Sequence, residues 1–415
     1  MLKKIAADQL AVGMYLHKLG GSWINHPFWR SSFVISTKDE IRQVVDSGIA
    51  EVWIDTEKGK DVSPTGGAAE DLEIVDDFEV PAASSAAEPI QLPTQNEVRH
   101  AGRVTMQDEV RRAAKICDSS KKAVRSMFEE VRMGKAISVE VAGEVVEEIS
   151  SSVVRNPGAL ISLARLKTAD DYTYMHSVAV CALMVALTRQ LGLNEEQTRE
   201  AGLAGLLHDL GKAVMPTAVL NKPGKLTDEE FSVIKQHPVE GHRMLLEGGA
   251  VGEIPLDVCL HHHEKVGGGG YPHGLKGDQI GLYAKMGAVC DVYDAITSNR
   301  PYKAGWEPAE SIARMTEWSK GHFDERVFQA FVRSIGIYPV GSLVRLASGR
   351  LGVVMEQSEK SLLMPKVKTI FSTKSKTFLP PEILDLSRGG NIDQIVGRED
   401  AAKWGIRNLE QLWAP

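Results

Sequence analysis

Histidine is concentrated in one part of this chain, and histidine and aspartate side chains are common ligands of divalent metal ions. A single histidine on an apolar helix face is usually a hydrogen-bonded core residue. Several in one segment favour a shared site. Eight of the 12 histidines lie within the 98 residues from 176 to 273, namely His176, His208, His237, His242, His261, His262, His263 and His273.

The pair His208-Asp209 lies in the apolar run LAGLLHDLGK. Its leucines are expected to anchor a helix in a core, so the imidazole and the carboxylate begin in a buried or cleft environment, where an unpaired carboxylate is costly. A carboxylate has two oxygens with which it can bridge a pair of ions about 3.5–4 Å apart. The pair occurs by chance in many proteins, so it indicates a metal site only together with partners.

Further candidate ligands for that site lie on expected helices, at their ends or between apolar residues. His176 lies on an expected helix, and His237 is followed by a proline, which indicates a helix start or a turn. His262 and His263 end a helix-like stretch, and Asp291 is flanked by apolar residues. A ligand set of imidazoles and carboxylates without a thiolate favours Fe or Mn, and Zn, Ni or Mg would also be compatible.

Two segments could contact a ligand. Residues Lys265 to Gly277 include six glycines among 13 residues and the pair Tyr271-Pro272. Glycine permits a close backbone approach to a ligand, although a flexible surface loop has the same composition. Arg300 and Lys303 place a guanidinium and an ammonium three residues apart, a pairing that suits phosphate but also occurs in solvated basic turns.

The sequence patterns around these residues predict a multidomain, mainly helical protein, whose elements must position the candidate site. Residues 1–58 combine short alternating stretches with a helix-like segment and indicate a small α+β domain, in which we expect aromatic residues such as Trp53 to form a small core. Residues 59–95 are rich in Gly, Ala, Ser and Pro and predict a flexible linker. Residues 96–336 predict an all-α bundle, in which Tyr172, Met175 and Ala179 share the apolar face of an amphipathic helix. Residues 337–415 predict a small β-rich appendage with a hairpin.

Composition excludes several classes of protein. The 415 residues include 48 basic and 55 acidic side chains, so the net charge of −7 argues against binding to a nucleic acid polymer. The four cysteines lie far apart without a C-x-x-C pair, which fits a reducing compartment. No stretch of about 18 consecutive apolar residues occurs, so we expect a cytoplasmic protein that is not inserted in a membrane.

Five ordered motifs together resemble the HD-GYP phosphodiesterases of bacteria. They are HDLGK (208–212), NKPGKLTDEE followed by the His237-Pro238 pair, HHE (262–264), GYP (270–272) and DVYDAITSNRPYK (291–303). The resemblance covers roughly residues 170–320 and is far more specific than a lone HD pair. Residues 1–58 are similar to the small uncharacterised domain that precedes some members.

The resemblance implies hydrolysis of the messenger cyclic di-GMP to pGpG, and in many members onward to GMP, by a metal-bridged hydroxide. It would lower messenger levels in the signalling that governs biofilm formation and motility. Asp209 would bridge two divalent ions, Lys212 would lie beside the scissile phosphate, and Arg300 and Lys303 would hold the phosphates. Gly270 and Tyr271 would line the substrate side. The implied metal ligands are His176, His208, Asp209, His237, His262, His263 and Asp291.

The chain departs from the family pattern at two places. Members with a third metal site have a glutamate four residues before the first histidine, whereas this chain has Tyr172, so we expect two metal ions. The usual Asp-Gly after the HHE motif is replaced by the segment Val266 to Gly269, which removes a carboxylate from the loop.

Other readings stay open from the sequence. Asp294 could orient a ligand imidazole or be an ordinary helix acid, and we assign His242, His261 and His273 to structural or solvent-facing roles. The chain could instead be an HD hydrolase of another nucleotide, or a non-catalytic receptor of cyclic di-GMP. It could form a homodimer or bind signalling partners through the GYP loop or the N-terminal domain.

Overall fold

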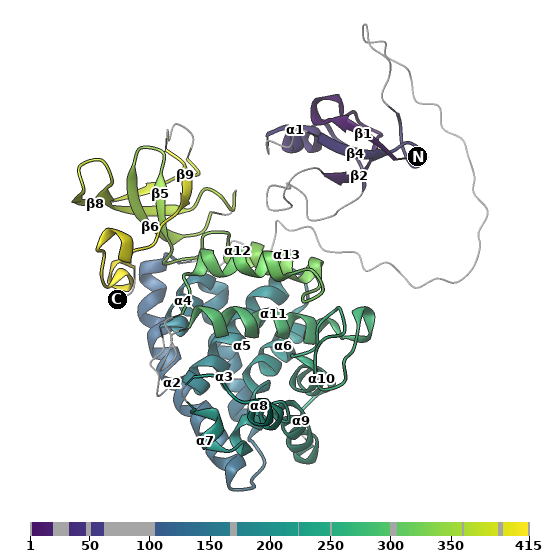
Figure 1. Cartoon of the computed structure of the whole chain (residues 1–415), viewed down its shortest axis with the longest axis vertical. Helices are drawn as coiled ribbons and strands as arrows, with labels where there is room; N and C mark the ends of the chain where they lie inside the picture. The colour runs from purple at the N-terminus through teal and green to yellow at the C-terminus, as the bar shows by residue number, and fades with distance from the viewer. Residues whose placement is uncertain are drawn as a thin grey trace, which may run out of the picture. The chain divides into compact units, whose positions relative to one another are not determined.

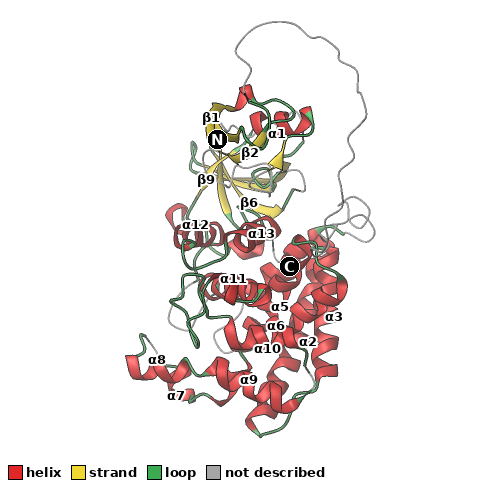
Figure 2. Cartoon of the chain, turned by 90° about the vertical axis from the view of Figure 1, so that its right-hand side faces the viewer, coloured by secondary structure: helices red, strands yellow, loops and turns green. Residues whose placement is uncertain are grey.

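The chain divides into two compact units, residues 1–91 and 92–415, which are described separately (Figure 1). The computed structural model describes residues 2–19, 33–46, 51–61, 104–166, 172–222, 224–249, 251–298, 305–358, 361–388 and 393–413. Most of the expected linker, from residue 62 onward, therefore lies outside the described residues. The prediction of a mainly helical protein with strands near both ends is confirmed (Figure 2).

The first unit is an antiparallel sheet with one helix. Its strands are β1 (Leu2–Ala6), β2 (Tyr15–Leu19), β3 (Phe33–Val34) and β4 (Glu51–Asp55), in the order β1-β4-β2-β3, and its helix is α1 (Lys38–Asp46). The expected core position of Trp53 is wrong, because this side chain is 38% exposed. Successive strand residues point to opposite faces, so Val52 and Ile54 of β4 fill the core and Trp53 between them faces out.

The second unit begins with a helical bundle. Its elements are α2 (Met106–Arg132), α3 (Val139–Arg155), α4 (Pro157–Arg165), α5 (Tyr172–Gln190), α6 (Glu195–Leu207), η3 (Leu210–Val214), α7 (Thr217–Leu220), α8 (Asp228–Ile234), α9 (His237–Gly248), α10 (Glu253–His261), η4 (Gly277–Gln279), α11 (Leu282–Thr297), α12 (Pro308–Trp318) and α13 (Glu325–Ile335).

Helix α5 is the central element of this bundle. Its residues from Met175 to Thr188 are buried on every side, and it packs against α2, α3, α4, α6, α11 and α13. The expectation of an amphipathic helix is therefore wrong for this element. Its sequence from residue 175 to 188 contains no Asp, Glu, Lys or Arg that would require a solvated face, so neighbouring helices can cover it completely.

The last segment forms an antiparallel sheet that packs with the bundle in the same unit. Its strands are β5 (Leu343–Leu346), β6 (Arg350–Glu356), β7 (Lys366–Ser372), β8 (Thr377–Asp385) and β9 (Ile395–Arg398), in the order β8-β7-β6-β5-β9. Two short 3-10 helices follow, η5 (Ala402–Trp404) and η6 (Leu409–Leu412). Arg398 of β9 pairs with Glu310 of α12, with Nη1 and Oε2 3.1 Å apart. No described helix has both the length and the apolar character that crossing a bilayer requires.

Candidate metal centre

Close helix contacts bring the separate candidate residues together. A Cβ on Gly205 of α6 would lie 3.0 Å from the backbone of Cys181 in α5, so a larger residue would force the two helices slightly apart. A Cβ on Gly211 of η3 would lie 1.9 Å from the carbonyl oxygen of His237, where α9 begins. The first contact places the end of α6 beside α5, and the second places η3 against α9. As a result, His208 and Asp209 lie between the two helices that carry His176 and His237.

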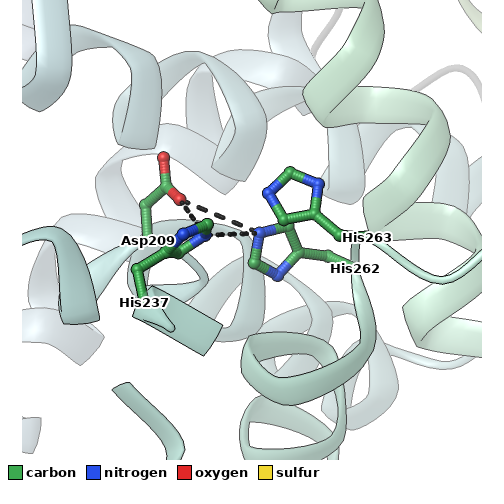
Figure 3. A group of neighbouring side chains, drawn as sticks. All are labelled: Asp209, His237, His262 and His263. Carbon is green, nitrogen blue, oxygen red and sulfur yellow. Dashed lines mark hydrogen bonds and ion pairs between the residues drawn. The ribbon is translucent and has the colours of Figure 1, made fainter. Parts of the chain in front are cut away.

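The seven predicted ligands form two adjacent groups. One consists of Asp209, His237, His262 and His263 (Figure 3), and the other of His176, His208 and Asp291. Within each group, one ligand atom from every residue lies within 4.8 Å of the others. The structure thus brings together residues from α5, α9 and α11, from the turn that follows α10, and from the segment that joins α6 to η3.

The two oxygens of Asp209 face different groups. Its Oδ1 lies 3.2 Å from Nε2 of His237. Its Oδ2 lies 3.4 Å from Nε2 of His176 and 3.4 Å from Nε2 of His208. Asp209 is 1% exposed, so its charge is shielded from water. This is the arrangement that a carboxylate needs in order to bind two ions at once.

Hydrogen bonds to the protein determine which nitrogen of each imidazole faces the centre. Nδ1 of His208 lies 2.8 Å from the carbonyl oxygen of Gly205, and Nδ1 of His237 lies 2.7 Å from that of Ile234. A carbonyl can only accept, so each Nδ1 carries the proton and donates it, which leaves Nε2 with a free lone pair. Nδ1 of His262 is held in the same way by two carbonyls of α10.

Charges around the centre favour the ligand forms of these residues. Burial alone would raise the pKa of the Asp209 carboxyl, but Lys212, His208 and His176 hold that pKa well below its usual range. Burial lowers the pKa of His263 to about 3, although the charge of Asp291 opposes this shift. Asp209 is therefore anionic and His263 neutral at neutral pH, as metal binding requires.

His176 behaves differently from His263. Burial lowers its pKa, but ion pairs with Asp209, Asp291 and Asp294 outweigh burial and raise the pKa to about 10. Nε2 of His176 lies 3.1 Å from Oδ1 of Asp291. In the absence of a cation, a proton on this nitrogen offsets the neighbouring carboxylates, and a divalent ion would take over that role.

Unsatisfied buried atoms test whether the residues fit a metal ion. Among the buried side-chain atoms of the described residues, Nε2 of His208 and Oδ1 of Asp209 lack a hydrogen-bond partner. Both belong to residues that are 1% exposed, where an unsatisfied polar atom is costly. Both atoms are oriented toward the centre and can donate a lone pair. The residues therefore fit divalent cations.

Two acids outside the ligand set hold neighbouring residues in place; the sequence left the role of Asp294 open and proposed none for Glu264. Oδ2 of Asp294 lies 2.6 Å from Nδ1 of His176, so the orienting role considered for Asp294 agrees with the geometry. Glu264 is buried, and its carboxylate accepts hydrogen bonds from the backbone N–H groups of His273, Gly274 and Leu275. Its position in the HHE motif was the signal that could have identified it.

The remaining predicted residues lie beside the centre or outside the described residues. Lys212 forms an ion pair with Oδ2 of Asp209. The ring of Tyr271 stacks on His263, with centroids 4.6 Å apart, and Gly270 precedes it in the same loop. Arg300 and Lys303 lie outside the described residues. Tyr172 stacks on His176, with centroids 5.8 Å apart.

A cavity of about 240 Å³ adjoins the centre. Lys265 and His322 lie in its wall, and neither was a sequence candidate. Burial and the nearby charge of Lys265 lower the pKa of His322 to about 4, so this imidazole is neutral at neutral pH. The lining residues are His262, His263, Glu264, Lys265, Tyr271, Asp291, Val292, Ala295, Ile296 and His322.

Comparison with known proteins places this geometry in a family. The HD domain model matches residues 151–327, and a domain of unknown function (DUF3391) matches residues 2–142. The chain is 52% identical over 414 residues to the cyclic di-GMP phosphodiesterase PA4108 of Pseudomonas aeruginosa, covering 100% of this chain and 96% of that protein.

Two further relatives match only part of the chain. The cyclic di-GMP phosphodiesterase response regulator RpfG of Xanthomonas campestris is 40% identical over 180 residues, which is 41% of this chain and 47% of that protein. The 3'3'-cGAMP-specific phosphodiesterase 1 of Vibrio cholerae is 35% identical over 190 residues, which is 46% of this chain and 42% of that protein. Because the similarity to the Pseudomonas protein extends over the whole chain and the HD motif lies at the centre of the buried ligand groups, the chain belongs to the HD-GYP family of cyclic di-GMP phosphodiesterases.

Proposed function

We propose that this protein is a metal-dependent phosphodiesterase that hydrolyses cyclic di-GMP to pGpG, with product analysis to decide whether GMP follows. The observation that carries the proposal is Asp209, whose two buried oxygens face two separate groups of ligand atoms. The relative that is similar over the whole chain is named a cyclic di-GMP phosphodiesterase, which supports this substrate.

Two divalent ions, with Fe or Mn preferred, would occupy the groups. His237, His262 and His263 would hold one ion, His176, His208 and Asp291 the other, and Asp209 would contact both. When bound, such ions make a hydrolytic water more acidic and offset the negative charge of phosphoryl oxygens. Tyr172 offers no carboxylate at the position where a third ion would need one, and its ring stacks on His176 instead, which supports two ions rather than three.

The chain's own residues would bind and orient the substrate around this centre. The Lys212 ammonium beside Asp209 would attract a phosphate, and Lys265 would add positive charge at the cavity wall. Tyr271, already stacked on His263, offers an aromatic edge to a guanine base. Neutral His322 could hydrogen-bond a base without repelling it. Arg300 and Lys303 would hold the phosphates.

Product analysis tests this proposal directly. Purified, metal-loaded protein should convert cyclic di-GMP to pGpG. Chromatography of the products detects pGpG and any GMP. A parallel incubation with 3'3'-cGAMP should give slower turnover. Binding of cyclic di-GMP without pGpG would instead identify a receptor, and faster turnover of 3'3'-cGAMP would identify a different nucleotide specificity.

Arg300 provides a second test that separates substrate binding from metal binding. Arg300→Ala should raise KM for cyclic di-GMP about tenfold or more, because one charge-assisted phosphate contact of about 1.5–3 kcal/mol is lost. Metal content, measured by mass spectrometry, should stay that of the unmodified protein. Loss of metal in this variant would show that Arg300 supports the centre rather than the substrate.

We also propose that the domains divide as 1–58, 59–95, 96–336 and 337–415, and that the protein acts in the cytoplasm. The end of the HD match at residue 327, shortly before the C-terminal strands begin, supports the third boundary. The first domain, or the GYP loop, would bind signalling partners, and the chain would form a homodimer. Limited proteolysis followed by mass spectrometry of the fragments tests the boundaries.

A further inference from the structure

The cavity beside the metal centre contains two polar side chains that belong to neither ligand group. His262, His263 and Asp291 in its wall are members of the groups, whereas Lys265 and His322 are not. The cavity volume of about 240 Å³ is below the range of roughly 300–1,000 Å³ that takes a whole drug-sized ligand. We therefore expect it to receive one part of a dinucleotide, next to the metal centre, rather than the whole molecule.

Apolar and aromatic side chains in the cavity wall suit a flat base. Val292, Ala295 and Ile296 are spaced i, i+3 and i+4 on α11, so they share one face of that helix. The ring of Tyr271 lies in the same wall. Such surfaces bind the face of any nucleobase. They therefore favour a base over a phosphate in this cavity, but they do not distinguish guanine from adenine.

Two backbone hydrogen bonds hold the segment after Lys265 against the turn that carries His322. The N–H of Val266 donates to the carbonyl oxygen of His322, 3.2 Å away, and the N–H of Gly267 donates to that of Gly321, 2.9 Å away. A Cβ on Gly267 would lie 2.8 Å from the same Gly321 oxygen, so this close approach needs glycine. The protein itself thus places both polar residues in the cavity wall.

The ammonium of Lys265 is available to a ligand in the cavity. Among the described residues, no side chain or carbonyl accepts a hydrogen bond from it or pairs with it as an ion. The neighbouring carboxylate of Glu264 accepts from three backbone N–H groups instead, and residues 266–269 contain no acid. A lysine ammonium has three donors and no acceptor. A ligand atom that meets Lys265 must therefore be an acceptor.

We propose that Lys265 makes this cavity selective for guanine over adenine by donating to O6 and N7 of the base. The inference rests on the proposed function, because the base must belong to the cyclic dinucleotide that reaches the metal centre. Guanine presents two acceptors, O6 and N7, on one edge, whereas adenine presents N7 beside an amino donor that an ammonium cannot bind. A neutral imidazole offers a donor and an acceptor, so His322 would hold either base.

The ratio of two rates tests the role of Lys265. In metal-loaded, full-length protein, kcat/KM is measured for cyclic di-GMP and for cyclic di-AMP. Lys265→Met keeps an unbranched apolar side chain without donors, and it should lower the ratio of the two values about 10- to 100-fold, through slower turnover of cyclic di-GMP. Lys320→Met, which removes an exposed ammonium from the turn that carries His322, should keep the ratio of the unmodified protein.

Two results would overturn the proposal. One is an unchanged ratio in Lys265→Met, even where both rates fall, because a lysine that contacts phosphate affects both substrates alike. The other is an equal fall of the ratio in Lys320→Met, because the effect would then come from net charge rather than from a contact with the base.

The products of 3'3'-cGAMP give a second test. With its guanine in the cavity, this substrate binds in one orientation, and one of its two phosphodiester bonds lies at the metal centre. The unmodified protein should therefore release one linear isomer, pGpA or pApG, in large excess, and Lys265→Met should release both in comparable amounts. Comparable amounts of both isomers from the unmodified protein would contradict the proposal.

Binding separates failure of this inference from failure of the proposed function. Calorimetry with the slowly hydrolysed phosphorothioate analogues of cyclic di-GMP and cyclic di-AMP measures affinity without turnover. Tighter binding of the guanine analogue that is lost in Lys265→Met, without hydrolysis of either natural dinucleotide, would refute the proposed hydrolysis and support the role of Lys265. Equal affinity of the unmodified protein for the two analogues would overturn that role, whether or not hydrolysis occurs.

Discussion

Replacing Glu264 by glutamine should release the GYP loop while leaving the metal centre loaded. Oε1 of Glu264 accepts from His273 and Gly274 at 2.7 and 3.0 Å, and Oε2 accepts from Leu275 at 3.0 Å. Glutamine keeps the shape and one oxygen, but its amide nitrogen would face the N–H of Leu275, donor against donor. One hydrogen bond is lost and the other two lose the charge of the acceptor.

The size of this effect follows from the three contacts. Hydrogen bonds to a charged group contribute about 1.5–3 kcal/mol each and neutral ones about 0.5–1.5 kcal/mol, so the substitution removes roughly 4 kcal/mol from the loop. Each 1.4 kcal/mol is a factor of ten in rate, so kcat/KM should fall between about tenfold and about 10³-fold, depending on how much of the hydrogen-bonded loop conformation the bound substrate restores.

Three measurements together check the reasoning. Hydrogen exchange of the backbone amides of residues 273–275 should become faster, steady-state kinetics with cyclic di-GMP should show the fall in kcat/KM, and metal content should be unchanged. Gln279→Ala is the matched control, because it removes a single neutral bond to the exposed N–H of Lys276 in the same loop. Unchanged exchange and kinetics in Glu264→Gln would refute the role of Glu264, and loss of metal would place its role at the centre instead.

Three other predictions concern the metal centre. Asp294→Asn should lower metal affinity about tenfold, because the neutral side chain no longer stabilises positive charge at His176, and a divalent ion carries more charge than a proton. Competition with a chelator measures this affinity. Equal affinity in the variant and the unmodified protein would argue against the 2.6 Å contact as an orienting bond. Asp209→Ala should abolish turnover and reduce bound metal together, and full activity would exclude Asp209 as the bridge. Removing the ions with a chelator should lower Tm, and adding an ion back at 100 times its Kd should restore about 2.7 kcal/mol of stability. Calorimetry measures Tm, and a Tm that does not change on removal or addition of the ions would count against ions in these groups.

Local patterns in the sequence predicted much of the fold because they depend only on neighbouring residues. The helix-like segment expected within residues 1–58 is α1, and the expected hairpin appears as β5 and β6. Strand β8 was missed because its sequence contains Pro380 and Pro381, which argue against a central strand. The structure explains this composition, since β8 lies at the edge of the sheet. The predicted polar face of α5 was wrong because burial of a central helix depends on neighbours that periodicity does not reveal.

The types and order of the candidate metal ligands could be read from the sequence, and so could the family of the chain. Only the tertiary structure decided which of them face one another: His176 and Asp294 are 118 residues apart in the chain, yet they share a hydrogen bond. The sequence likewise left Asp294 between two roles. Helix periodicity specifies the direction of a side chain relative to its own helix, but the partner it meets depends on how helices pack, and that packing is determined by contacts between distant segments such as those of Gly205 and Gly211.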